Sequence, residues 1–342
     1  MIMLRIVVCL FFVMCIAYLS AQNPFRIVFY NVENLFDTKD NPHTDDNDWL
    51  PKGNQRWSNY RYWQKLKGLS AAIDSIGENY PPALIGLCEV ENDSVLFDLC
   101  KRSPLRKHKY RYIITKSKDD RGMNVALLYQ RDEMKLLTVK EYTPNFLDTP
   151  DKHTRNILHV TGLVISGDTL DIFICHFPSR VDGIKRTRPF RQQAAQLLRQ
   201  QVDKVMSRRV KANVIIMGDF NDFPNDDSML KILAAGSMSE SFKYKNLYNM
   251  FLDRIKESDT GSYKYRGKWQ FMDQFVVNGN LLNSVNTVSV NNNTAKVFSG
   301  DFLLENDEKY GGKKPFRTYV WRKYLGGLSD HLPIYLDLRI KE

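Results

Sequence analysis

The chain has few cysteines, and this scarcity excludes a fold held together by disulfides. Its 342 residues contain five cysteines, and two of them, Cys9 and Cys15, fall in an N-terminal apolar segment that we expect to be removed. The remaining Cys88, Cys100 and Cys175 cannot form a closed disulfide framework. Cys88 and Cys175 lie in apolar runs typical of strands, where small thiols usually pack into the core. A mature chain of about 320 residues is long enough to bury a large core instead.

Long apolar runs are also scarce. The run from Ile6 to about Ala17 is too short for a comfortable membrane span. With Arg5 before it and Ser20 and Ala21 after it, the segment is typical of a secretory signal peptide that is cleaved after Ala21. An uncleaved anchor is the alternative. We therefore expect a secreted or periplasmic protein with no stable membrane partner.

Basic residues outnumber acidic residues in this chain. The sequence also shows no low-complexity linker and no internal repeat. Lysine and arginine exceed aspartate and glutamate by 49 to 39, which gives a formal net charge of +10. A basic exported protein suggests a polyanionic partner such as nucleic acid, phosphorylated lipid or an anionic surface. The length suits one large domain or two modest ones, and no protein partner is evident.

Apolar runs and amphipathic stretches alternate along the rest of the chain. The runs predict strands, and the stretches with apolar residues at helical spacing predict helices. The predicted strands are 25–30, 83–88, 110–115, 124–129, 157–165, 169–177, 214–217, 271–277 and 332–338. Helices are predicted at 60–76 and 190–206, with a short one near 228–235, and loops at 37–53, 178–191 and 278–312.

The stretch from Val214 to Asn221 carries the clearest chemical signal. Four apolar residues indicate a buried strand, which ends at a glycine followed by Asp219 and Asn221. Side chains at i and i+2 of an extended segment point the same way, so a carboxylate and an amide can converge on one ligand. A metal with its bound phosphate would suit them. A strand that runs into an Asx-turn is the simpler alternative.

The other predicted strands end in the same kind of polar side chain. These residues are Asn31, Glu89, His176, Asp273, and Asp330 with His331. Loops at one edge of a rigid sheet are where catalytic groups usually assemble. Carboxylate and amide oxygens suit Mg²⁺, Mn²⁺ or Ca²⁺ better than zinc, and two histidines could supply acid and base for phosphoryl chemistry. Each residue taken alone could also be a satisfied structural group.

Six short motifs, in this order, resemble the signature of the endonuclease/exonuclease/phosphatase superfamily. They are Tyr-Asn31-Val-Glu-Asn-Leu-Phe, Leu-Cys-Glu89-Val, Cys-His176-Phe-Pro-Ser-Arg, Gly-Asp219-Phe-Asn221, Met-Asp273-Gln-Phe and Ser-Asp330-His331-Leu-Pro. The resemblance covers residues 25 to 340. It implies an α/β fold, a four-layer α/β/β/α sandwich of two mixed sheets flanked by helices, formed by a single domain over residues 22–342.

The resemblance also implies roles for these residues. Glu89 would be the principal metal ligand, helped by Asn31 and Asp330. Asp219 and Asn221 would position the attacking water and the phosphate. His331, oriented by Asp273, would contact the scissile phosphate and act as the base or stabilise it, and His176 would be the acid or a phosphate-binding partner. Whether Asp219 or His331 takes the proton of the water stays open.

Two further features concern the substrate. The basic segments 180–191 and 313–322 could grip flanking phosphates, and we expect Arg180, Arg188 and Arg317 to bind substrate. The carboxylate that partners the acid histidine in the pancreatic deoxyribonuclease has no clear match, and residues 121–124 stand near the expected place. The segment 36–57 and the long loop before Ser329 are not general family features.

Three functions remain in competition. The first is a metal-dependent phosphodiesterase, an endonuclease that hydrolyses DNA or RNA with Mg²⁺, or with Mn²⁺ or Ca²⁺. The second is a phospholipid or inositol-phosphate phosphodiesterase or phosphatase on the same fold, which predicts an exposed apolar hairpin that the sequence does not reveal. The third is a binding protein that keeps the scaffold without catalysis, and the intact set of polar residues argues against it.

Overall fold

The structure, a computed structural model, describes residues 24–239 and 241–341. The predicted signal peptide and its cleavage site after Ala21 lie outside these residues. Among the described residues, no helix has both the length and the apolar character needed to cross a membrane.

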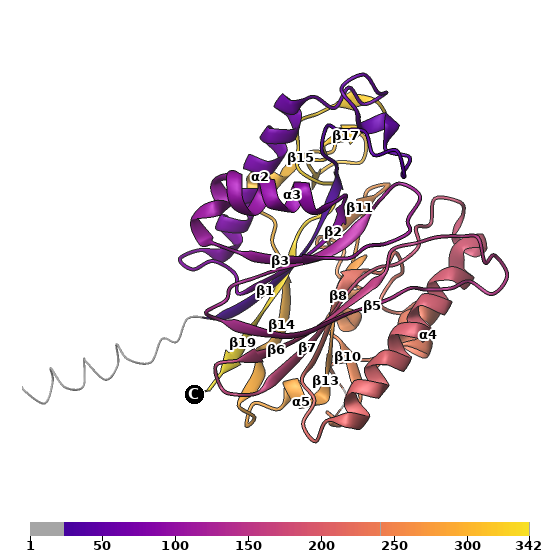
Figure 1. Cartoon of the computed structure of the whole chain (residues 1–342). Helices are drawn as coiled ribbons and strands as arrows, with labels where there is room; N and C mark the ends of the chain where they lie inside the picture. The colour runs from indigo at the N-terminus through magenta and orange to yellow at the C-terminus, as the bar shows by residue number, and fades with distance from the viewer. Residues whose placement is uncertain (1–23, 240, 342) are drawn as a thin grey trace, which may run out of the picture.

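Two large mixed sheets form the centre of the molecule (Figure 1). The first has the order β14 (Val288–Val297), β19 (Ile334–Ile340), β1 (Phe25–Leu35), β2 (Leu84–Val90), β4 (Asn124–Tyr129) and β3 (Arg111–Ile114). The second has the order β5 (Met134–Tyr142), β6 (Ile157–Val164), β7 (Thr169–His176), β8 (Val214–Asp219), β13 (Asp273–Asn278), β10 (Leu247–Asn249) and β9 (Ala235–Gly236).

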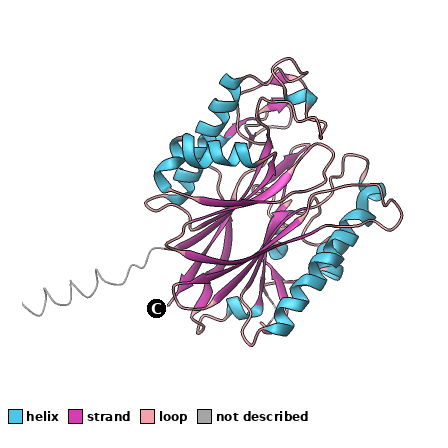
Figure 2. Cartoon of the chain, in the orientation of Figure 1, coloured by secondary structure: helices cyan, strands magenta, loops and turns pink. Residues whose placement is uncertain are grey.

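Helices cover the outer faces of both sheets, as Figure 2 shows. The helices are α2 (Asn59–Gly77), α3 (Asp93–Phe97), α4 (Ile184–Arg208) and α5 (Gly279–Leu282). One apolar cluster lies between the two sheets, a second between the first sheet and α2 with α3, and a third between the second sheet and α4. These three layers of core separate four layers of secondary structure, which confirms the predicted α/β/β/α sandwich.

Helix α2 shows how local sequence sets these elements. Ser58 caps its start by accepting a hydrogen bond from the backbone nitrogen of Arg61 (3.4 Å). Its buried face includes Leu66, Leu69 and Ile73, which recur at helical spacing. The helix ends at Gly77, as the sequence predicted. This face packs against the first sheet. Its burial stabilises the sheet and therefore the position of the polar edge of the sheet.

Short hairpins and single helical turns make up the smaller elements of the structure. Three short hairpins are β11 (Tyr263–Tyr265) with β12 (Lys268–Gln270), β15 (Leu304–Asn306) with β16 (Lys313–Pro315), and β17 (Tyr319–Val320) with β18 (Lys323–Tyr324). Single helical turns are η1 (Asn47–Trp49), η2 (Asp98–Arg102), η3 (Pro104–His108), η4 (Ser228–Ile232), η5 (Leu252–Arg254) and η6 (Asp301–Leu303).

The topology gathers six strand ends at one edge of the sandwich. β1 runs parallel to β2, and β7 runs parallel to β8, so the carboxyl ends of each pair lie together. β13 is antiparallel to β8, and its first residue, Asp273, pairs with Asp219. β19 is antiparallel to β1 and begins three residues after His331. The predicted functional segments therefore reach one edge from both sheets.

Two loop predictions were wrong. Residues 278–312, predicted as a polar loop, contain the ten-residue strand β14, which pairs with β19. A bulge between Val290 and Ala295 interrupts this pairing and leaves a polar stretch that is typical of a loop. Residues 178–191 were also predicted as a loop, but α4 begins at Ile184 and contains Pro189. Strand β5, at the edge of the second sheet, was not predicted.

Candidate active site

Backbone irregularities in two neighbouring strands aim the first two side chains. The register between β1 and β2 shifts between Asn31 and Leu35. Glu33 (φ 45°) and Asn34 (φ 52°) lie in this bulge, and Glu89 (φ 62°) lies in the matching irregularity of β2. Such left-handed positions are costly for residues other than glycine and cluster at functional sites. Bulges re-aim side chains beside active sites, and here they turn Asn31 and Glu89 toward the edge.

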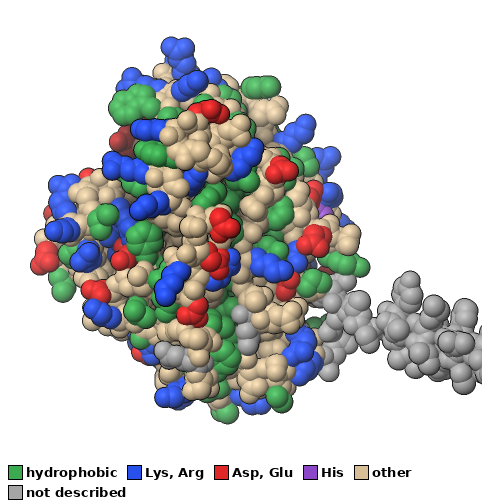
Figure 3. Space-filling model, turned by 180° about the vertical axis from the view of Figure 1, so that it is seen from behind, with side chains coloured by type: hydrophobic (Ala, Val, Ile, Leu, Met, Phe, Trp, Pro, Cys, Tyr) green, Lys and Arg blue, Asp and Glu red, His purple; other side chains and the backbone are tan. Residues whose placement is uncertain are grey.

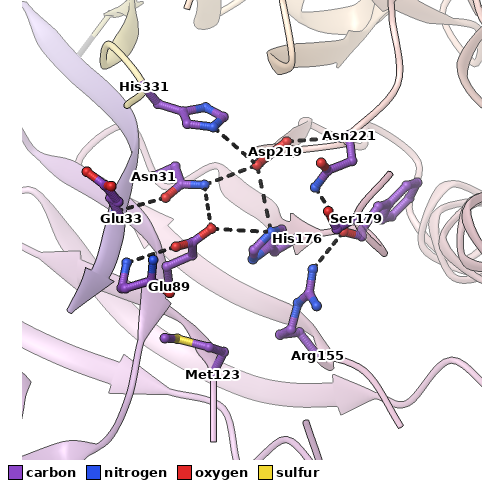
Figure 4. Close-up of polar contacts among 12 residues, drawn as sticks. Asn31, Glu33, Glu89, Met123, Arg155, His176, Ser179, Asp219, Asn221 and His331 are labelled. Carbon is purple, nitrogen blue, oxygen red and sulfur yellow. Dashed lines mark hydrogen bonds and ion pairs between the residues drawn. The ribbon is translucent and has the colours of Figure 1, made fainter. Parts of the chain in front are cut away.

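Asn31 links the two sheets. Its Nδ2 donates to Glu89 Oε1 and to Asp219 Oδ2, both at 3.1 Å, and its Oδ1 accepts from the backbone nitrogen of Glu33 at 3.0 Å. Glu89 Oε2 accepts from the backbone nitrogen of Asn34 at 2.8 Å. Figure 4 shows Asn31, Glu89 and Asp219 directed at one another. One buried amide thus holds a carboxylate from each sheet.

The strand end at Asp219 contains the Asx-turn that the sequence offered as the simpler alternative, and the convergence of Asp219 and Asn221 on one ligand stays a prediction. Asp219 Oδ1 accepts from the backbone nitrogen of Asn221 at 2.9 Å, and Asn221 has φ 50°. Asn221 Nδ2 donates to the carbonyl of Phe177 at 3.1 Å. Gly218 is required here because a Cβ at that position would overlap the carbonyl oxygen of Cys175. The turn fixes Asp219 while its second oxygen faces the site.

Two imidazoles flank that second oxygen. Asp219 Oδ2 lies 3.7 Å from His176 Nε2 and 3.9 Å from His331 Nε2. His176 Nε2 also lies 3.9 Å from Glu89 Oε1. The other ring nitrogen of His331, Nδ1, lies 2.6 Å from Asp273 Oδ2. The structure therefore brings Asn31, Glu89, His176, Asp219, Asp273 and His331 into one cluster.

The surroundings of His176 and His331 shift the pKa values of the two imidazoles in opposite directions. Burial, with the positive charges of Arg155 and Arg121, lowers the pKa of His176 well below its usual range. Burial opposes the charge of His331 too, but the carboxylates of Asp273 and Asp219 raise the pKa of His331 well above its usual range. These surroundings favour the neutral form of His176 and the protonated form of His331.

The pKa of Asp219 also departs from that of an ordinary carboxyl. Burial raises the pKa of Asp219, although the charge of His331 opposes the shift.

His176 Nδ1 is buried and has no hydrogen-bond partner among the described residues. This agrees with the missing carboxylate partner noted in the sequence; Met123 from the segment 121–124 lies near the cluster in Figure 4.

The donor set fits a hard divalent cation. Among the described residues, Glu89 and Asp219 form ion pairs with histidine but with no lysine or arginine. A buried carboxylate (Asp219) and a half-buried one (Glu89) bonded to one amide favour a cation. Ligand atoms of Asp219, Asp273 and His331 lie within 4.8 Å of one another, but Asp273 and His331 are hydrogen-bonded to each other. Glu89 is therefore the better-placed ligand.

The other two predicted ligands are engaged elsewhere. Asn31 presents its amide nitrogen to Glu89, and its oxygen accepts from the backbone of Glu33. Asp330 Oδ2 accepts from Arg317 Nη2 at 2.9 Å. In this arrangement Asn31 orients the carboxylates. The assignment of Asn31 and Asp330 as ligands stays a prediction.

The three predicted substrate-binding arginines have different surroundings. Arg317 lies at the site and bridges Glu33 (3.3 Å) and Asp330 (2.9 Å). Arg180 donates to Asp222 at 2.9 Å and to the carbonyl of Asn221, so it supports the Asn221 turn. Arg188 is exposed on α4. Their contact with substrate stays a prediction.

Arg191, which was expected to be in the basic loop, is instead part of the core. Its side chain is fully buried on α4 and donates from Nε to Asp222 Oδ1 at 2.7 Å. It is not free to grip a phosphate. Asp222 also accepts from Ser228 at 2.6 Å, so this carboxylate is a hub beneath the site.

Sequence reasoning missed two buried cations that support the site. Lys65, on α2, donates to the carbonyl of Glu33 and to Thr318 Oγ1 (2.8 Å), and so fixes the bulge in β1. Arg155 donates to Asp119 (3.2 Å) and to the carbonyl of Phe177 (2.7 Å), beside His176. Lys65 carried a signal, since a lysine on the buried face of an amphipathic helix needs a partner. Arg155 lies in an irregular stretch without a motif.

A family model, described as the Endonuclease/Exonuclease/phosphatase family, matches residues 26–340. The chain belongs to this family. No curated protein sequence matches it. Members of the family are phosphoester hydrolases, and their usual dependence on divalent metals agrees with the acidic site described above.

Solved structures of several family members are similar to this chain. D. rerio TDP2, humanized by 14 mutations, shares 16% identity with a TM-score of 0.56, over 93% of this chain and 99% of that one. The human Nocturnin catalytic domain shares 15% identity (TM-score 0.53; 93% and 94% covered). A mannosyl-6-phosphatase of Bacteroides thetaiotaomicron shares 16% identity (TM-score 0.55; 92% and 99% covered). At these identities the likeness concerns the fold.

Proposed function

We propose that this family member is a Mg²⁺-dependent phosphodiesterase and that it acts as an endonuclease on DNA or RNA. The position of Asp219 carries the proposal. Its Oδ2 lies 3.1 Å from Asn31, 3.7 Å from His176 and 3.9 Å from His331. A buried carboxylate between two imidazoles suits proton removal from a water that attacks phosphorus in line with the leaving oxygen.

Each side chain then has a distinct task. Asp219 takes the proton of the attacking water, because its raised pKa makes it a stronger base than an exposed carboxylate. His331, kept protonated by Asp273, donates from Nε2 to the phosphate. His176 is neutral and donates its remaining N–H to the same group. Donors aimed at developing negative charge stabilise the transition state more than the substrate.

A divalent ion would be held by Glu89, with Asn31 and Asp330 beside it. When bound, it would neutralise charge on the phosphate oxygens as a Lewis acid. Oxygen donors suit Mg²⁺, and Mn²⁺ or Ca²⁺ are the alternatives.

A polymeric polyanion is the proposed substrate. The formal charge of +10 favours such a partner. In Figure 3, Lys and Arg side chains are spread over the face seen from behind, with Asp and Glu between them. Nucleic acid is supported further by the structure of D. rerio TDP2 with a single-strand DNA product. Arg317, at the site itself, is the cation best placed to contact a flanking phosphate.

A second candidate, a phospholipid or inositol-phosphate hydrolase, is favoured by one hairpin. Val320 is 45% exposed and Trp321 85% exposed where β17 turns into β18, and Arg322 and Lys323 beside them are exposed. An apolar tip with flanking cations suits the interface of a lipid membrane. Arg317, which lies at the site, precedes Val320 of this hairpin tip by three positions in the sequence.

A substrate panel separates the two candidates. The mature protein is incubated with supercoiled plasmid, total RNA, sphingomyelin vesicles, phosphatidylinositol vesicles and mannose 6-phosphate, each with Mg²⁺ or EDTA. Metal-dependent nicking of plasmid or cleavage of RNA supports the endonuclease. Release of a headgroup or of inorganic phosphate, with plasmid and RNA intact, would contradict it in favour of the second candidate or of a sugar phosphatase.

We also propose that the protein is exported, because residues 1–21 have the pattern of a signal peptide. N-terminal sequencing of the protein expressed with this segment in a bacterial host gives a direct answer. A start at Gln22 in the extracytoplasmic fraction is expected, whereas an intact Met1 in the cytoplasm would contradict export.

A further inference from the structure

The hairpin of β11 and β12 places a tyrosine against a histidine of the active site. Tyr263, the first residue of β11, forms an antiparallel β-bridge with His331. Its ring packs on the imidazole of His331, with 4.8 Å between the ring centroids and 35° between the ring planes. Asp273 holds Nδ1 of the same imidazole at 2.6 Å. Tyr263 therefore touches a side chain on which the proposed reaction depends.

The residue before Tyr263 ties β11 to two other segments of the site. Ser262 is fully buried. Its Oγ accepts from the backbone nitrogen of Asp273 at 3.1 Å, and its carbonyl accepts from the backbone nitrogen of Leu332 at 2.6 Å. These bonds join β11 to the start of β13 and to the segment that carries His331. The position of Tyr263 is thus set by the same strand ends that position the histidine.

The residue after Tyr263 fixes β11 from its other side. Lys264 Nζ donates to the carbonyl oxygens of Gly311 (2.8 Å) and Lys313 (3.0 Å) and pairs with Asp307 at 3.2 Å. The side chain of Lys264 is only 5% exposed, so this cation holds β11 to β16. A residue on a strand that is anchored on both sides is already in place when a ligand arrives.

The hydroxyl of Tyr263 has no partner within residues 24–239 and 241–341. It neither donates nor accepts a hydrogen bond there, and unlike Nδ1 of His176 it is not a fully buried atom. Tyr263 as a whole is half-buried. A phenol hydroxyl is a hydrogen-bond donor that keeps its proton at neutral pH. This one is held beside His331 and is open to a ligand.

The charges near Tyr263 agree with a hydroxyl that faces the site. Burial and the carboxylate of Asp330 raise the pKa of Tyr263 to about 12, while the charge of Arg317 opposes the shift. Asp330 and Arg317 form an ion pair at the site (2.9 Å). The hydroxyl therefore lies on the side of the ring where substrate would bind.

We infer that Tyr263 is a further catalytic residue, whose hydroxyl donates a hydrogen bond to an oxygen of the phosphate that His331 binds. The inference rests on the proposed phosphodiester hydrolysis. A neutral donor suits this place, because it stabilises the negative charge that develops on the phosphate without adding a positive charge that would repel the divalent ion. The ring of Tyr263 also packs on one face of the imidazole and limits its rotation.

Tyr263→Phe removes the hydroxyl and keeps the ring with its contact to His331. We expect urea to unfold the variant at the wild-type concentration. For bis(p-nitrophenyl) phosphate with Mg²⁺, kcat should fall by roughly tenfold or more while KM changes by less than about twofold, because the lost hydrogen bond is strongest in the transition state. Tyr80→Phe is the matched control, since Tyr80 is 50% exposed in the loop before β2, away from the end that carries Glu89.

Orthovanadate tests the contact without turnover, because this anion can adopt the five-coordinate geometry of in-line attack. NMR signals of the His331 ring are followed while orthovanadate and Mg²⁺ are added to the wild type, to Tyr263→Phe and to Tyr80→Phe. We expect orthovanadate to bind Tyr263→Phe more weakly than the other two proteins, by roughly the factor lost in kcat.

One result would overturn the inference. A folded Tyr263→Phe protein with the wild-type kcat and the wild-type affinity for orthovanadate would show that the hydroxyl touches no substrate. That result leaves the endonuclease proposal intact if the wild type nicks plasmid. A wild type that cleaves no phosphodiester, but binds orthovanadate more tightly than Tyr263→Phe does, would contradict the endonuclease and still support the contact of Tyr263 with phosphate.

Discussion

His331 Nδ1 lies 2.6 Å from Asp273 Oδ2, while its Nε2 lies 3.9 Å from Asp219 Oδ2. Asp273 is fully buried at the start of β13, and its pairing partner across the sheet is Asp219. The carboxylate of Asp273 thus fixes the ring of His331, and the Nε2 of this ring faces Asp219 without a direct hydrogen bond to it. A histidine held in this way has a defined orientation and a stabilised positive charge.

Asp273→Asn tests this relationship. The amide keeps the size of the side chain but cannot stabilise the imidazolium, so we expect the rate of phosphodiester hydrolysis to fall by roughly 10²- to 10⁴-fold. NMR titration of the His331 ring should show its pKa moving downward. A full rate with an unchanged ring pKa would show that Asp273 serves only the packing of β13.

Glu89→Gln tests the cation of the active site. The amide retains the shape of Glu89 but removes the charge that attracts a divalent ion, and we expect the Mg²⁺ concentration for half-maximal rate to rise at least tenfold. Excess Mg²⁺ should restore part of the lost rate. Wild-type Mg²⁺ dependence in the variant would place the ion on other residues.

Asp222→Ala tests the hub beneath the site. The change leaves Arg191, whose side chain is fully buried, without its carboxylate, and an unpaired buried charge costs about 3–5 kcal/mol of unfolding free energy. Urea denaturation measures this loss. Asp203→Asn is the control, because the pair of Asp203 with Arg199 is partly exposed and should contribute at most about 1 kcal/mol. Equal losses in the two variants would contradict the role of Asp222.

Asp171→Asn tests a buried cluster on the second sheet. Burial alone would raise the pKa of Asp171, but hydrogen bonds from His159 (3.0 Å), Thr161 (2.7 Å) and Arg209 hold this pKa below its usual range. A carboxyl with a depressed pKa stabilises the fold above its unfolded pKa of about 3.9, and this contribution is lost as the pH falls through the folded pKa.

The variant should therefore differ most at neutral pH. We expect Asp171→Asn to unfold more easily than the wild type at pH 7, and the difference between the two unfolding free energies to shrink between about pH 5 and pH 2. Urea denaturation at a series of pH values measures it. A difference that does not change with pH would assign the loss to packing and not to charge.

The sequence predicted the site better than it predicted the loops. Polar residues after apolar runs are visible in a sequence, so the sequence predicts Asn31, Glu89, His176 and Asp219 at one edge of the sheets. The family motifs added the pairing of Asp273 with His331. What remained hidden was the backbone that aims them, because the left-handed bulges at Glu33 and Glu89 have no glycine to mark them.

The missed elements have physical reasons. β14 contains a bulge within an asparagine-rich stretch, so its apolar alternation is broken. The start of α4 contains Pro189 and several cations, which favour a loop in a reading based on local propensity. Arg191 is buried only because Asp222, 31 residues away, meets it in the folded chain. Long-range pairs of this kind cannot be read from local pattern.

The central claim is that His331 and its neighbours hydrolyse a phosphodiester with the help of a divalent ion. The most direct measurement is the initial rate of bis(p-nitrophenyl) phosphate hydrolysis by the wild type and by His331→Asn, each with Mg²⁺ and with EDTA. His108→Asn is the matched control, because His108 pairs with Asp74 on α2 (2.6 Å) and not with the active-site cluster. We predict a Mg²⁺-dependent rate that His108→Asn retains and that His331→Asn lowers at least 10²-fold. A wild-type rate in His331→Asn, or hydrolysis that persists in EDTA, would contradict the account.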